Sequence, residues 1–196
     1  MKDYIKRILI VIFGAFVMGT GIVLFINSGF GGDPLSVFNQ GLALKIKLPL
    51  GTVAQIVNIS IIFIVFLIDR SHVGIGSVIN AITVGMFINL LINVPLLKPQ
   101  SFGMSIVGLL IGVVLLGVGI GIYLTAELGE GSIEGLMMIL NERTKIDIKW
   151  IRIVIDTILT ITGYFLGGTF GVGTIAGALC TGPITEFTLK SLEGNN

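Results

Sequence analysis

Ionisable residues in the second half of the chain gather around a point where glycines break an apolar run. Glu130 and Glu134 stand in this break, LGEGSIEGLMMIL, and Arg152 and Asp156 stand on the apolar run that follows. Residues four apart share one face of a helix, so Arg152 and Asp156 are expected to form an ion pair. Glu134 directly precedes an apolar segment, where the positive end of a helix dipole favours a carboxylate. Charged groups in so apolar a chain predict a site for a solute or an ion.

A second glycine break, SGFGGDP, lies in the first half and carries Asp33 directly before Pro34. This order is typical of a helix N-cap followed by the first helical residue. The Asp33 carboxylate also lines a cavity if the glycines admit a ligand to the backbone. Asn58 joins the candidate site because it precedes Asp156 by 98 positions. The glycines of the two breaks are Gly29, Gly31, Gly32, Gly129 and Gly131.

Each candidate group also has a purely structural interpretation, which the sequence leaves open. Capping alone explains Asp33, and an exposed acidic loop explains Glu130. Arg152 and Asp156 are equally explained by an ion pair that positions a helix near the membrane interface, with the arginine side chain reaching toward water.

The sequence shows no recognisable set of catalytic residues, such as a nucleophile with a general base, so the chain is not expected to be an enzyme. His72 is the one histidine and has no partner at ligand spacing, and Cys180 is the one cysteine, so neither a metal nor another cofactor is expected. The glycine-rich strings lack the strand that precedes a dinucleotide-binding motif. The sequence has no basic cluster beyond short loop runs, which argues against nucleic acid as a partner.

The elements that must position these residues are membrane helices. Hydrophobic residues make up 54% of the chain and charged residues 12%, about half the charged share of soluble domains. Apolar runs of about 20 residues can cross a bilayer, so we predict an all-α, polytopic protein with the lipid bilayer around it. Six long spans are expected at about 5–27, 52–68, 73–94, 102–125, 150–166 and 171–189. Two short helices are expected at 34–46 and 133–142, which either cross the membrane or re-enter it.

The two halves of the chain resemble each other at their glycine landmarks. GTGIVLF at 19–25 matches GVGIGIY at 117–123, and GIGS at 74–77 matches GVGT at 171–174, at spacings of 98 and 97 residues. The pattern predicts two tandem homologous membrane repeats, 1–98 and 99–196. Duplicated halves that each hold a broken helix are typical of transporters with a site at the repeat interface. Whether the repeats are parallel or inverted depends on whether the short helices cross.

Longer strings carry a resemblance to a known family. They are GFGGDPLSVFNQGLA at 29–43, GIGSVINAITVG at 74–85, LGEGSIEGLMMILNERT at 128–144, WIRIVID at 150–156 and GGTFGVGTIAGALCTGP at 167–183. With these strings the chain resembles the YczE/YyaS/YitT family of bacterial integral membrane proteins, most of all its YczE branch. The resemblance implies a small multi-pass protein of the bacterial cytoplasmic (inner) membrane, and it implies no substrate.

Together these patterns predict a secondary transporter or channel-like carrier of an unidentified small solute. The alternative is a non-transporting scaffold or accessory subunit for a biosynthetic or signalling partner. A scaffold is expected to have a packed repeat interface in which Glu134 only caps a helix, whereas a transporter needs a polar cavity there. The sequence leaves a homo-oligomer open.

Overall fold

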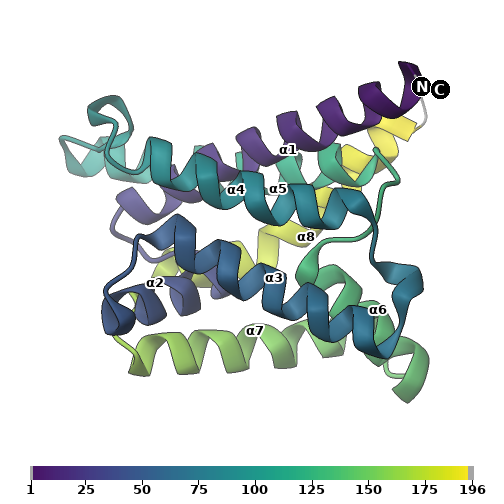
Figure 1. The fold of residues 1–196 in the computed structure, drawn as a ribbon. Helices are drawn as coiled ribbons and strands as arrows, with labels where there is room; N and C mark the ends of the chain where they lie inside the picture. The colour runs from purple at the N-terminus through teal and green to yellow at the C-terminus, as the bar shows by residue number, and fades with distance from the viewer. Residues whose placement is uncertain (1, 194–196) are drawn as a thin grey trace.

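Helices account for the regular structure of residues 2–193, the part of the chain that this computed structural model describes, and no strand occurs in that part (Figure 1). The predicted all-α fold is therefore confirmed. The outer limits of the predicted halves, residue 1 and residues 194–196, lie outside the described part. The first half contains α1 (Lys2–Asn27), α2 (Pro34–Ile46), α3 (Leu50–Ile68) and α4 (Ile75–Leu91). The second half contains α5 (Phe102–Leu124), α6 (Ser132–Thr144), α7 (Ile148–Phe165) and α8 (Val172–Glu193).

Three of these helices are long and apolar enough to cross a membrane: α1 from Asp3, α3 and α5. Helix α4 is apolar but has only 17 residues. Large apolar side chains lie exposed on the outside of the bundle, including Phe63 on α3 and Leu110 on α5. Such a surface suits lipid rather than water. The chain is a helical membrane protein, and six long spans stay a prediction.

Helices α1 and α5 pack closely against each other and run antiparallel. Gly14 of α1 packs against Tyr123 of α5, whereas Gly21, further along α1, packs against Leu116, earlier on α5. A Cβ atom on Gly21 would lie 2.6 Å from the backbone nitrogen of Leu116. Small residues at this contact let the two backbones approach closely, as in other membrane helix pairs.

The short helices α2 and α6 lie at opposite ends of the molecule, α2 against α7 and α6 against α3 (Figure 1). Each contains 13 residues, and they start 98 positions apart. Both end at a lysine in the left-handed conformation, Lys47 and Lys145. Glycines with positive φ, Gly31 and Gly129, recur in the breaks before them at the same spacing. The two halves thus share the order and local geometry of their helices.

Each glycine break docks on the last helix of the other half. The Gly76 backbone N–H at the start of α4 donates to the Leu128 carbonyl of the second break, at 2.8 Å. In the reciprocal contact, the Gly173 N–H at the start of α8 donates to the Phe30 carbonyl of the first break, at 2.9 Å. These paired contacts hold the start of α2 against the second half and the start of α6 against the first half.

Candidate functional site

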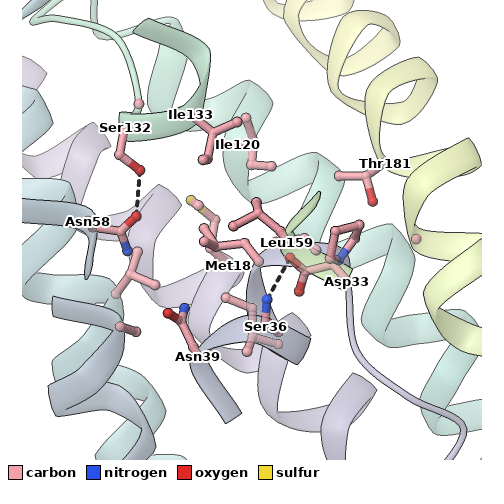
Figure 2. Close-up of a pocket in the computed structure, with 18 of the residues that line it drawn as sticks. Met18, Asp33, Ser36, Asn39, Asn58, Ile120, Ser132, Ile133, Leu159 and Thr181 are labelled. Carbon is pink, nitrogen blue, oxygen red and sulfur yellow. Dashed lines mark hydrogen bonds between the residues drawn. The ribbon is translucent and has the colours of Figure 1, made fainter. Parts of the chain in front are cut away.

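A cavity of about 110 Å³ lies between the two halves and is lined by residues of both (Figure 2). The sequence-predicted site residues that line it are Asp33, Asn58, Gly131, Glu134, Arg152 and Asp156. Glu130 and the glycines at 29, 31, 32 and 129 do not line it. The walls between the polar groups are apolar and include Met18, Ile120 and Leu159. The structure therefore brings most of the predicted side chains together from segments that are distant in the sequence.

Asp33 lies at the start of α2, and its two carboxylate oxygens differ in their contacts. Oδ2 accepts a hydrogen bond from the Ser36 backbone N–H at 3.3 Å, which is the predicted N-cap. Oδ1 is buried without a hydrogen-bond partner, and the residue lines the cavity. The capping interpretation and the cavity interpretation of Asp33 therefore both hold.

Glu134, Arg152 and Asp156 line the cavity from the second half. Glu134 is in the first turn of α6, and its carboxylate folds back over Gly131, so closely that a side chain at that glycine would collide with it. The Nε atom of Arg152 lies 3.6 Å from Oδ2 of Asp156 on α7, which is the ion pair expected from their spacing. The cavity wall thus holds three carboxylates and one guanidinium.

Buried side-chain polar atoms without a partner concentrate at this cavity. Within the described residues there are six, and all but the Glu130 Oε2 belong to residues that line it. Buried polar groups in folded proteins are almost always hydrogen-bonded, to protein or to water. A concentration of such groups at one cavity indicates that a polar ligand or water supplies their missing hydrogen bonds. Four of the five atoms are Asp33 Oδ1, Asn39 Oδ1, Asn80 Oδ1 and Thr181 Oγ1. The fifth, Arg152 Nε, makes no hydrogen bond but lies 3.6 Å from Asp156 Oδ2 in the ion pair.

Asn58 has a structural bond of its own. The Ser132 hydroxyl at the start of α6 donates to the Asn58 Oδ1 on α3, so this pair links the two halves beside the cavity (Figure 2). Ser132, Asn39 and Thr181 were not among the sequence-predicted site residues. The signal that could have found them is a polar side chain inside an otherwise apolar run, which lipid-facing positions disfavour.

Glu130 lies outside the cavity, beside the loop between α3 and α4. Its Oε1 is 3.2 Å from Nδ1 of His72, and Oε2 of Glu142 is 3.4 Å from Nε2 of the same ring. Asp69 completes a group whose ligand-type atoms lie within 4.8 Å of one another with His72 and Glu142. His72 has no partner at ligand spacing in the sequence, but the structure brings it together with partners 58 and 70 positions away. Burial lowers the pKa of His72, but the bonds to and charges of Glu130 and Glu142 outweigh it and raise the pKa.

A larger apolar groove of about 970 Å³ lies between α7 and α8. Four residues line both the groove and the cavity: Pro34, Arg152, Asp156 and Ala178. The polar space between the halves therefore adjoins an apolar space at the side of the bundle.

Comparisons with known proteins agree with this description of a membrane protein. The chain is 31% identical over 177 residues to the uncharacterized membrane protein YczE of Bacillus subtilis, covering 90% of this chain and 82% of that one. It is 27% identical to the uncharacterized protein YyaS of the same organism, covering 86% and 85%. It is 29% identical to an uncharacterized protein of Haemophilus influenzae, covering 94% and 84%. The resemblance to YczE and YyaS is thereby confirmed, and no solved structure matches the chain significantly.

The same comparisons place nearly the whole chain in one family. A family model matches residues 5–190, so the two halves, the cavity and the groove all fall within it. The chain therefore belongs to the family of unknown function DUF6198.

Proposed function

We propose that the chain is a secondary transporter of a small solute in the bacterial cytoplasmic membrane, and that the solute binds in the cavity between the two halves. The observation that carries the proposal is the group of unpartnered polar atoms at that cavity. A packed scaffold interface would not need a polar cavity of this kind, because each buried polar group that stays without a partner costs about 1–3 kcal/mol. A transported solute would complete their hydrogen bonds in the bound state.

The arrangement of the helices supports alternating access as the mechanism. We take the halves to be inverted repeats, because α1 and α5 occupy the same place in each half and run antiparallel. The short helices α2 and α6 then re-enter the membrane instead of crossing it. Rocking of one half against the other would expose a fixed site to either side in turn.

Carboxylates at the site suggest how transport is driven. The sequence holds no nucleotide-binding motif, so an ion gradient is the expected energy source. Asp33, Glu134 and Asp156 line the cavity, and carboxylates that exchange protons with two sides of a membrane act as proton relays. We propose proton coupling through one or more of these groups, with the protein acting as a carrier and not as an enzyme.

A ligand screen on purified protein tests the proposal. A solute that binds only the folded state raises the melting temperature, by an amount that depends on its concentration relative to Kd. Amines, amino acids, sugars, nucleosides and inorganic ions are added separately, and a melting shift of the unaltered protein is expected with at least one class. The shift should be lost in Glu134→Gln and Asp156→Asn.

The matched control is Glu127→Gln, because Glu127 is an exposed carboxylate that pairs with Arg7 away from the cavity, at 3.3 Å. This control should keep the full shift. Hits that persist unchanged in both cavity variants would show that the solute does not bind there. A screen without any hit would favour the scaffold.

A further inference from the structure

The groove between α7 and α8 is built from apolar side chains and opens on the outer surface of the bundle. Its lining includes Ile153 and Ile161 of α7 and Ile175 and Leu179 of α8. All four are well exposed, Leu179 to 69%. This surface faces the hydrocarbon of the bilayer if α7 and α8 cross the membrane, because only an apolar exterior is stable there. An apolar chain dissolved in the bilayer can therefore reach the groove from the side.

The groove adjoins the polar cavity, because the two share lining residues. Arg152 and Asp156 on α7, together with Pro34 and Ala178, line both spaces. The Arg152 guanidinium reaches across toward α8, where a Cβ atom on Gly182 would lie 3.4 Å from its Nη1. A molecule lying across this junction would place one end among carboxylates and the other among isoleucines and leucines. Such a molecule is an amphiphile.

The volumes of the cavity and the groove limit the sizes of the polar group and the apolar chain of this amphiphile. The cavity measures about 110 Å³ and the groove about 970 Å³. Ligand pockets for drug-sized molecules span about 300–1,000 Å³, so the cavity alone holds only a small polar group. The groove is large enough for an extended alkyl chain.

The charges around the cavity set the sign of the polar group. Asp33, Glu134 and Asp156 face a single guanidinium, that of Arg152, and Arg152 is already paired with Asp156 at 3.6 Å. Asp33 Oδ1 has no partner. A group that donates hydrogen bonds and carries positive charge satisfies these acceptors, whereas an anion would bring further acceptor atoms to a wall that already holds three carboxyl groups.

We propose that the solute is an amphiphilic amine that enters from the bilayer between α7 and α8. Its ammonium group binds in the cavity beside Asp33 and Asp156, and its apolar chain lies in the groove. This inference rests on the proposed function and names the substrate class for that same site. It also assigns the groove a role as a lateral entrance.

Photocrosslinking in lipid nanodiscs tests where such a molecule binds. The probe is decylamine with a diazirine near the end of its chain, and peptides that carry the label are identified by mass spectrometry. Label is expected on the groove faces of α7 and α8, around Ile153 and Leu179. Excess decylamine should compete it away, and decanoate, with an equally long chain but the opposite charge, should not.

Two variants check the two ends of the bound molecule. Asp156→Asn should weaken competition by decylamine by about tenfold, which corresponds to about 1.4 kcal/mol for the lost charge-assisted contact. Ala178→Phe should block the junction and remove the competed label. Val154→Phe is the matched control for the added bulk, because Val154 is 56% exposed on α7 and does not line the groove. It should leave the label unchanged.

Label spread evenly over all lipid-facing helices, or competed equally by decanoate, would overturn the inference. Competition by butylamine as strong as that by decylamine would also overturn it, because the chain would then contribute nothing. In that last case the proposed transporter function would stand, with a small hydrophilic amine as its solute. Loss of all specific binding, together with a ligand screen that gives no hit, would instead contradict the proposed function itself.

Discussion

The contact between α3 and α4 and the groove between α7 and α8 follow each other in the chain at the spacing of 97–98 residues, yet the first is closed and the second open. In the first half, the Gly51 N–H donates to Asn89 Oδ1 at 2.8 Å, and the Gln55 side chain donates to the Ile82 carbonyl at 2.7 Å. Gly51 and Gly85 have no side chains to separate the two backbones.

The corresponding residues of the second half, 97 or 98 positions later, are Lys149, Ile153, Leu179 and Glu186, and all four line the groove. Gly51 and the two amides Gln55 and Asn89 thus match Lys149, Ile153 and Glu186, and within the described residues none of these three bonds across the groove. Gly85 matches another glycine, Gly182. The comparison shows that a few side chains decide whether two neighbouring helices pack together or leave a groove between them.

The largest effect is expected from forcing the closed contact apart. A Cβ atom on Gly51 would collide with the Gly85 carbonyl oxygen, so Gly51→Leu must separate α3 from α4. Overpacking of this kind costs about 2–3 kcal/mol, which lowers the melting temperature by about 5–10 °C. Lys149→Leu, the corresponding change beside the open groove, should leave it unchanged. Equal effects of the two variants in a thermal melt would contradict the difference between the halves.

A smaller loss is expected when only the polar bonds of the closed contact are removed. Asn89→Leu deletes the acceptor of the Gly51 N–H and the donor to the Thr52 hydroxyl. The cost should be about 1–3 kcal/mol, measured by chemical or thermal unfolding in detergent. Glu186→Leu is the control on α8, since Glu186 is exposed and bonded only to Lys190. The control should unfold as the unaltered protein does.

Asn58 and Asp156 lie 98 positions apart, but substitution of Asn58 should mainly lower stability, whereas substitution of Asp156 should mainly weaken ligand binding. Asn58→Ala removes the acceptor of the Ser132 hydroxyl and should lower stability by about 1 kcal/mol. Asp156→Asn keeps the shape of the side chain and should affect ligand binding far more than stability. Melting temperatures with and without ligand separate the two effects. A loss of ligand response in Asn58→Ala that exceeds the loss in Asp156→Asn would reverse these roles.

The smallest effect concerns the two loops that precede α4 and α8. His72 faces Glu130 and Glu142, with Asp69 nearby, whereas the other loop is held by a neutral bond from the Thr169 N–H to Gln40, at 2.6 Å. Because the pKa of His72 is raised in the folded state, its stabilisation is present below the unfolded pKa of about 6.5 and is lost as pH rises through the folded pKa.

The melting temperature should therefore fall slightly between about pH 6 and pH 8. His72→Gln should flatten this fall, and Gln40→Leu, which removes the neutral bond, should lower stability equally at every pH. A pH profile that is unchanged in His72→Gln would show that other groups cause the dependence.

Much of the framework could be predicted from local sequence signals. The Asp33–Pro34 pair fixes the start of α2, which ends at Ile46 as expected. Helix α4 is shorter than the predicted 73–94, because Val73 is extended and Pro95 begins a separate turn. The Arg152–Asp156 pair followed from a spacing of four, and the structure places it at the cavity.

The features that could not be predicted depend on distant parts of the chain. His72 meets glutamates 58 and 70 positions away, and no local pattern pairs them. The groove is a missing contact between two apolar helices, and hydropathy does not distinguish a lipid-facing side chain from one that packs on a neighbour. Asn39 and Thr181 joined the cavity only once the helices had been placed.

The most direct test of a transported solute is the accessibility of the cavity from the two sides of a membrane. Cys180 is the one cysteine of the chain, so Cys180→Ser with Thr181→Cys places a single thiol at the cavity wall. In proteoliposomes a small cationic, membrane-impermeant thiol reagent is applied to either face. Alternating access predicts labelling from both faces, slowed by a bound solute. A thiol that stays unlabelled from both faces would contradict a transport site between the two halves.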